Sequence, residues 1–131
     1  MNCQPTRDIE ERTFKFGVRI IKLCQFLEKK SWANSTLGRQ LLRSGTSIGS
    51  NVEEAQAAES RADFASKNSI ALKEARETHY RLRLPGAADL VIPARLQPLM
   101  GEALELKRIL GAIVVSARRN SKLQTQKLLM K

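Results

Sequence analysis

Residues 41–84 read LLRSGTSIGSNVEEAQAAESRADFASKNSIALKEARETHYRLRL, and no other part of the sequence is as distinctive. Its first half repeats small and apolar residues at i, i+4, i+7, i+11 and i+14, which places them on one face of an α-helix: Leu41, Gly45, Ile48, Val52 and Ala55. A glycine inside a helix costs about 1 kcal/mol relative to alanine. Gly45 and Gly49 therefore indicate that a second helix approaches this one closely, because glycine has no Cβ to keep a partner away.

The same residues allow a second interpretation. Turn-forming residues cluster over 45–51, so a loop inside this segment stays open at the level of sequence. In the helical interpretation, the second helix runs from Thr36 to Ala58 with Ser35 as its N-cap, after a short loop over 31–35. Trp32 lies in that loop, where we expect its ring to pack over the end of the bundle.

A first helix is expected before this segment, from Thr6 to Lys30. Its core stripe follows spacings of four, three and four residues: Phe16, Ile20, Leu23 and Leu27. Further apolar residues widen the sector: Phe14, Val18, Ile21 and Cys24. Such a wide sector indicates either deep burial or contact with a neighbouring subunit. We favour the subunit contact, because the remaining face of the helix is basic, and therefore expect a homo-oligomer.

Two more helices are expected after residue 60. The third runs from Arg61 to Leu84, with Ser60 as N-cap and Pro85-Gly86 as its stop. Its expected inward face is formed by Phe64, Asn68, Ala71, Leu72, Ala75, His79 and Leu82. An apolar connector over 87–93 leads to the fourth helix, from Ala94 to Arg119. This last helix has the cleanest heptad pattern: Leu96, Leu99, Ala103, Leu106, Leu110, Ile113 and Ala117.

The four expected helices and their short connections predict an all-α fold. We expect one domain over residues 1–119, an antiparallel up-and-down four-helix bundle. Residues 120–131 contain lysines and no acidic residue, and we expect them to form a flexible basic tail.

The run SGTSIGSNVEEAQAAESRADFASKNSIALKEARETHYRLRL, residues 44–84, closely resembles a bacterial four-helix-bundle family, the 23S rRNA intervening-sequence proteins. The same family includes the accessory proteins of diversity-generating retroelements. The resemblance continues more weakly over Phe14 to Arg119, and its motif is one of packing rather than of chemistry. It implies a barrel-like homopentamer with a basic surface. It also implies action beside a reverse transcriptase and binding to nucleic acid, as for accessory members of the family.

The charge of the chain points to a polyanionic partner. Lys and Arg total 23 against 13 acidic residues, a formal net charge of +10. A stripe along the first helix holds the expected main phosphate contacts: Arg12, Lys15, Arg19 and Lys22. Expected secondary contacts lie on the second and third helices: Arg39, Arg43, Lys73, Arg76 and Arg83. Tyr80 is interleaved with the last three. Its ring could stack on an unpaired base, but a tyrosine at such a position more often packs at the rim of the bundle. A merely solvated basic face is the open alternative.

Several classes of protein are disfavoured by the sequence. No apolar run reaches 18 residues, and the N-terminus is polar, so we expect neither a membrane span nor a signal peptide but a cytoplasmic protein. Cys3 and Cys24 are then reduced thiols. His79 is the single histidine, and Arg76 stands where a Glu-x-x-His metal motif needs glutamate. We therefore expect no catalytic site, metal or cofactor. An enzyme whose site forms only between subunits is a weaker possibility.

Two functions follow from these observations. The first is a non-enzymatic oligomeric scaffold that holds the phosphate backbones of RNA or DNA without strong sequence specificity. The alternative is an interaction adaptor for a reverse transcriptase or another nucleic-acid enzyme, which the resemblance suggests.

Overall fold

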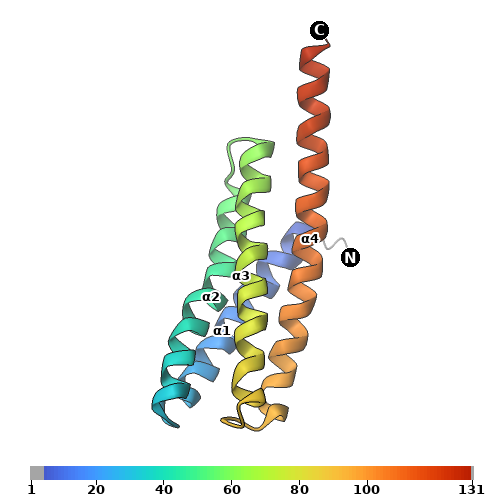
Figure 1. Ribbon diagram of the computed structural model, residues 1–131. Coiled ribbons are helices and arrows are strands. Elements are labelled where there is room, and N and C mark those ends of the chain that lie inside the picture. Colours follow the sequence, from blue (N-terminus) through green and yellow to red (C-terminus); the bar gives the residue numbers. More distant parts are fainter. Residues whose placement is uncertain (1–4, 131) are drawn as a thin grey trace.

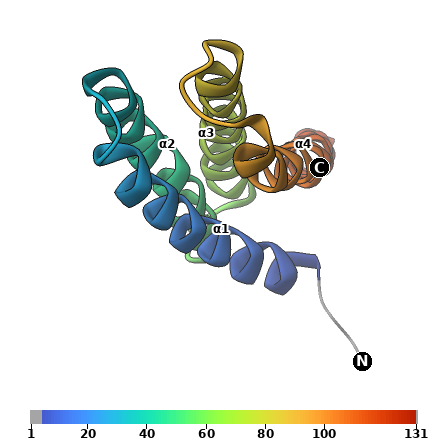
Figure 2. The same cartoon turned by 90° about the horizontal axis from the view of Figure 1, so that it is seen from below.

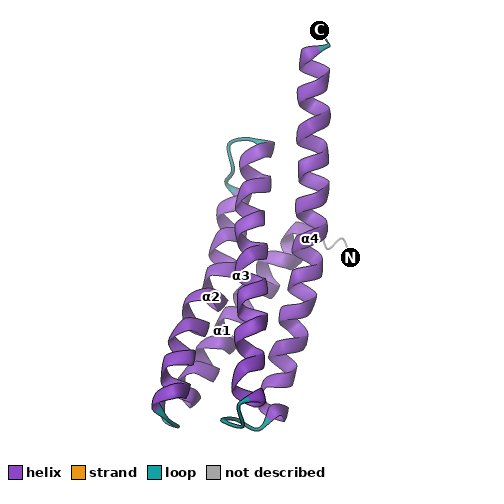
Figure 3. Cartoon of the chain, viewed as in Figure 1, coloured by secondary structure: helices purple, strands orange, loops and turns teal. Residues whose placement is uncertain are grey.

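A computed structural model of the chain describes residues 5–130, with side chains from Asp8 onward; Cys3 and Lys131 lie outside the described residues. Four helices make up this part of the chain: α1 (Pro5–Glu28), α2 (Trp32–Gln56), α3 (Arg61–Ala87) and α4 (Pro93–Leu129) (Figure 1). Between residues 5 and 130 there is no β-strand, only helices joined by short connections (Figure 3). The predicted all-α four-helix bundle is therefore confirmed.

Helices that follow one another in the chain lie side by side. α1 packs on α2, α2 on α3 and α3 on α4, whereas contact between α1 and α4 is limited. Figure 2 shows why: α1 runs obliquely beneath the other helices, with its C-terminal end beside α2 and its N-terminal end toward α4. The bundle is thus tightly packed along three of its sides and more open between its first and last helices.

The predicted core stripes are buried. On α1, Phe16, Ile20, Leu23 and Leu27 are all at most 7% exposed. The stripe predicted for α2 is also buried throughout: Leu41, Gly45, Ile48, Val52 and Ala55. On α4 one position differs, because Val114 is buried and Ile113 only half-buried. On α3, Thr78 faces the interior in place of His79 and hydrogen-bonds to Ser44 of α2 at 2.9 Å.

Two of the three glycines of α2, Gly45 and Gly49, lie where α1 comes close. A Cβ added to Gly45 would be 2.9 Å from Ile20 Cγ1, a separation that real Cβ atoms do not adopt. A Cβ added to Gly49 would be 3.3 Å from the carbonyl oxygen of Thr13. α2 is one helix through both positions, so the loop considered for 45–51 is not formed. The small side chains therefore set the distance between α1 and α2.

The start of α2 differs from the prediction. The helix begins at Trp32, and Ser31 rather than Ser35 is its N-cap, with the Asn34 N–H donating to Ser31 Oγ at 3.2 Å. Both serines can cap a helix. A helix capped at Ser31 has one more turn of backbone hydrogen bonds than a helix capped at Ser35. The Trp32 side chain is 84% exposed. The expectation that it packs over the end of the bundle was therefore wrong.

α3 begins as predicted and ends later than predicted. The Asp63 N–H donates to Ser60 Oγ at 3.0 Å, which confirms the N-cap. The helix continues through Pro85 to Ala87. Proline removes one backbone donor, but the Pro85 ring is buried and its carbonyl accepts the N–H groups of Leu90 at 2.9 Å and Val91 at 3.3 Å. Packing and these turn bonds offset the lost helical bond.

α4 is also longer than predicted. We expected it to end at Arg119, but it continues to Leu129 and projects beyond the other helices (Figure 1). The last glycine of the chain is Gly111, and residues 112–129 contain no proline. Lys, Arg, Leu and Gln, which dominate this end, are good helix formers. The end of the core seam at Ala117 therefore does not end the helix.

Candidate functional site

The basic stripe of α1 is only partly free. Arg12 is half-buried and forms a bidentate ion pair with Glu102 of α4, with Nη2–Oε1 at 2.6 Å and Nε–Oε2 at 3.1 Å. This hydrogen bonding to Glu102 raises the pKa of Arg12. Lys15 is exposed and pairs with Glu11 at 2.8 Å. Arg19 and Lys22 are exposed and make no ion pair with any described carboxylate. Arg12 thus links two helices, whereas the other three cations remain accessible.

The cations predicted on α2 divide in the same way. Arg39 is exposed and lies on the rim of a small pocket between α1 and α2. Arg43 reaches across to α3, where it pairs with Glu77 at 2.6 Å and with Glu74 at 3.5 Å. Arg81 pairs with Glu77 at 2.8 Å. Charge on this face is therefore largely matched by carboxylates.

This ion-pair network predicts a pH dependence of stability. Hydrogen bonds from Arg81 and Arg43 lower the pKa of Glu77 to about 2. The stabilisation provided by ionised Glu77 is fully present above the pKa of about 4.3 that a glutamate has in the unfolded chain. It is lost as the pH falls through the pKa of Glu77 in the folded protein. Glu77→Gln should therefore cost about 0.5–1 kcal/mol at pH 7, after allowance for solvent screening, and progressively less at acid pH. Urea unfolding at pH 7, 4 and 2.5 measures this difference.

The matched control is Glu53→Gln, the same substitution at an exposed position of α2 with no ion pair among the described residues. We expect the free energy of unfolding of Glu53→Gln to equal that of the wild type at every pH. A Glu77→Gln profile parallel to that of the wild type would contradict the role assigned to the network.

A groove between α3 and α4 brings together cations that are far apart in the sequence. A pocket of roughly 490 Å³ is lined by Lys73 and Arg76 of α3 and Arg118 of α4, together with Ser69 and Gly111. Arg118 Nη2 donates to Ser69 Oγ at 3.1 Å. The sequence identified the two α3 cations, but it placed Arg118 at the end of the fourth helix, next to the tail. The missing information was which residues of α4 lie opposite which residues of α3.

About one turn beyond Arg76, α3 carries His79 and Tyr80, which lie outside the lining of this pocket. His79 is half-buried, and its pKa is lowered first by burial and then by the positive charges of Lys107 and Arg83. Burial and these two charges therefore favour the neutral imidazole. Tyr80 is 54% exposed, with the Arg83 guanidinium 5.6 Å from the centre of its ring. Lys107, like Arg118, is a cation of α4 that the sequence did not assign to this face.

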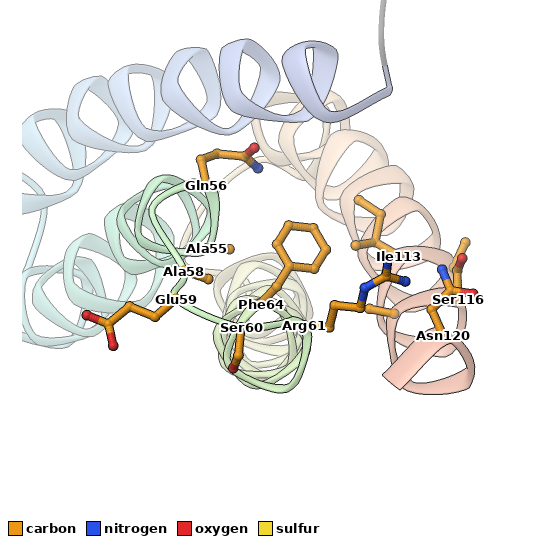
Figure 4. Close-up of a pocket in the computed structure, with 12 residues that line it drawn as sticks. Ala55, Gln56, Ala58, Glu59, Ser60, Arg61, Phe64, Ile113, Ser116 and Asn120 are labelled. Atoms are coloured by element: carbon orange, nitrogen blue, oxygen red, sulfur yellow. The ribbon is translucent and has the colours of Figure 1, made fainter. Parts of the chain in front are cut away.

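Another pocket lies where the end of α2 and the start of α3 meet α4 (Figure 4). It has a volume of roughly 620 Å³, with Ala55, Phe64 and Ile113 among its apolar walls. Figure 4 shows Phe64 between α2 and α4, and Arg61 extending toward α4. The lining contains neither histidine nor cysteine, so it offers no thiol or imidazole chemistry.

Other candidate chemistry is sparse in the described part of the chain. Residues 5–130 hold no group of three or more His, Cys, Asp or Glu side chains placed to bind a metal ion. Cys24 is half-buried, its Sγ lies 3.0 Å from the Gly38 carbonyl oxygen, and burial raises its pKa to about 11. The thiol is thus protonated and unreactive at neutral pH.

No described helix combines the length and apolarity needed to span a membrane.

Comparison with known proteins agrees with the architecture. The family model of the 23S rRNA-intervening sequence protein matches residues 6–112. The structure resembles the crystal structure of a protein of unknown function from the S23 ribosomal protein family of Bacteroides thetaiotaomicron VPI-5482. The two share 36% sequence identity with a TM-score of 0.79, and the match covers 85% of this chain and 98% of that one. The comparison with curated proteins gives no match. The chain belongs to the family of 23S rRNA-intervening sequence proteins.

Proposed function

We propose that this protein is a non-enzymatic, oligomeric scaffold that binds the phosphate backbone of nucleic acid. The observation that supports it most directly is the net charge of +10 together with exposed, unmatched cations on α1 and α3. Each phosphate neutralised by such a cation releases condensed counterions, which favours binding without sequence specificity. The family description, which refers to 23S rRNA, is consistent with this proposal but names no activity.

On α1 the proposed phosphate contacts are Lys15, Arg19 and Lys22, with Arg39 beside them on α2. All four side chains are exposed. Arg12 belongs to the same stripe but is engaged by Glu102, so we assign it to holding α1 against α4. Arg43 is similarly engaged by Glu77 and contributes less than the sequence suggested.

The protomer is proposed to be an antiparallel up-and-down bundle that assembles into a ring, a homopentamer by family resemblance. An apolar strip on the outer face of α1 and α2 supports a subunit contact: Phe14 is 65% exposed, Ile21 42%, Leu42 40% and Val18 39%. Exposed apolar groups gathered on one face are typical of interaction sites. Repetition around a ring would multiply the basic surface of each protomer.

A salt titration tests the scaffold. Binding of labelled duplex DNA and of a structured RNA is measured against salt for the wild type and for Lys15→Ala/Arg19→Ala/Lys22→Ala. Loss of three phosphate contacts should reduce the slope of log K against log salt by about 2–3. The control, Lys30→Ala/Lys67→Ala/Arg108→Ala, removes the same charge outside the α1 stripe and should leave most of the slope. Circular dichroism checks that both variants fold.

Failure of the wild type to bind either polymer at low salt would overturn the scaffold. The exposed apolar strip on α1 and α2 would then favour the alternative, a protein-interaction adaptor for a reverse transcriptase or another nucleic-acid enzyme.

A further inference from the structure

We propose that the groove between α3 and α4 is a binding site for single-stranded nucleic acid, with phosphates on Lys73, Arg76 and Arg118 and an unstacked base on Tyr80. This inference rests on the proposed function and deepens it, because it names the form of the strand and the face that holds it. Four observations support it: the unmatched charge of the groove, its shape at Gly111, the orientation of Arg118, and the exposed ring of Tyr80.

The charge in this groove is not matched by carboxylates. Lys73 and Arg76 from α3 line the pocket with Arg118 from α4, and Arg83 and Lys107 lie near His79 further along α3. None of these five makes an ion pair with a described carboxylate. On α1 and α2 the cations are mixed: Arg12, Lys15 and Arg43 each hold a carboxylate within 3 Å, whereas Arg19, Lys22 and Arg39 hold none among the described residues. Like charges gathered from two helices repel one another, and a polyanion relieves that repulsion.

The groove also has room for a phosphate backbone. A Cβ added to Gly111 of α4 would meet nothing within 4 Å, so the helix backbone is uncovered there. Two turns further along α4, the hydrogen bond from Arg118 to Ser69 uses one guanidinium donor and leaves the others available. Arg118 is thereby held against α3, near Lys73 and Arg76. A strand lying over Gly111 would meet cations on both sides.

Tyr80 makes the site suit a single strand rather than a duplex. It lies one turn beyond Arg76 on α3, and more than half of its surface is exposed, 54%. Aromatic side chains bind single strands by stacking on bases, which a duplex keeps inside its own stack. Arg83 lies 5.6 Å from the ring and adds a cation to the same end of the groove. Lys73 to Arg83 spans about 15 Å along the helix axis, so several contacts can form along one strand.

An acidic protein segment would be attracted by the same cations. It would have no need for the ring of Tyr80, since stacking requires a base. The two ligands are therefore distinguished by a substitution that changes the ring and not the charge.

The test uses the full chain and fluorescence anisotropy with labelled oligo(dT) and oligo(U) 20-mers and a 20-base-pair duplex. Lys73→Ala/Arg76→Ala/Arg118→Ala should weaken single-strand binding about 10- to 100-fold. Lys15→Ala/Arg19→Ala/Lys22→Ala, which removes the same charge from α1, should affect single strands less and the duplex more. Tyr80→Ala should weaken single-strand binding about 5- to 100-fold, and Tyr80→Phe should restore it.

Three results would overturn the inference. The first is a groove variant that loses no more single-strand affinity than the matched α1 variant. The second is equal binding of Tyr80→Ala and Tyr80→Phe. The third is a fall in poly-glutamate affinity on Tyr80→Ala that equals the fall in single-strand affinity, because poly-glutamate has no base to stack on the ring. In any of these cases the α1 variant can still show weaker duplex binding with a smaller salt dependence than the wild type. The proposed scaffold then stands, and only the assignment of the groove fails. A wild-type protein that binds neither the single strands nor the duplex would contradict both the scaffold and the groove proposal.

Discussion

Replacing Gly45 by leucine is expected to destabilise the protein by about 3 kcal/mol or more. Even a single added carbon would lie 2.9 Å from both Cγ1 and Cγ2 of Ile20, which is itself fully buried. A leucine cannot be accommodated without moving α1 away from α2, because packed interiors yield little. Urea unfolding followed by circular dichroism measures the loss. If the variant is too unstable to unfold cooperatively, Gly45→Ala gives a milder version of the same contact.

The matched control for this substitution is Gly101→Leu. Gly101 is an exposed helical glycine of α4, and a Cβ added there would meet nothing within 4 Å. Leucine at Gly101 should stabilise the helix by up to about 1 kcal/mol, since it removes the entropic cost of glycine. Equal effects at the two positions would show that α1 does not approach α2 as described.

Phe16→Ala is expected to cost about 3–5 kcal/mol. The Phe16 ring is 1% exposed in the centre of the core, and its removal leaves a cavity that the helices cannot fully close. The same substitution two residues earlier, Phe14→Ala, is the control, because that ring is 65% exposed. Phe14→Ala should change the stability of a protomer by less than about 0.5 kcal/mol.

The variants Phe16→Ala and Phe14→Ala also distinguish an effect on folding from an effect on assembly. If Phe14 lies at a subunit contact as proposed, Phe14→Ala should lower the oligomeric mass at a protein concentration where the fold is intact. Light scattering after size-exclusion chromatography measures that mass. A Phe14→Ala protein with the mass of the wild type would remove α1 from the proposed interface, and a Phe16→Ala protein of unchanged stability would contradict the core.

Periodicity predicted most of the fold because burial on a helix depends on spacing alone. The core stripe of α1 and that of α2 are buried as predicted, and Ser60 caps α3. Positions where two candidates compete were not decided by local rules. Ser31 and Ser35 are equally good caps, and only the structure shows that the first is used. Pro85 is a helix stop by local chemistry, but its burial keeps it inside α3.

The candidate site was less predictable, because charge pairing depends on tertiary neighbours. The stripe of α1 gave no sign that Arg12 would be held by Glu102, which is 90 residues away in the chain. Conversely, Lys107 and Arg118 join the α3 cations only once the alignment of α3 with α4 is known. A helical wheel shows the face of one helix, whereas the groove is made by two.

The packing of each helix on its neighbour in the chain has a consequence for how the protein folds. Since α1–α2, α2–α3 and α3–α4 hold most of the tertiary contacts, few long loops must be closed before favourable contacts form. Chains dominated by such local contacts cross a small entropic barrier and fold on the microsecond-to-millisecond scale. Formation of one hairpin can template the next, so the limited α1–α4 side would be the last to close.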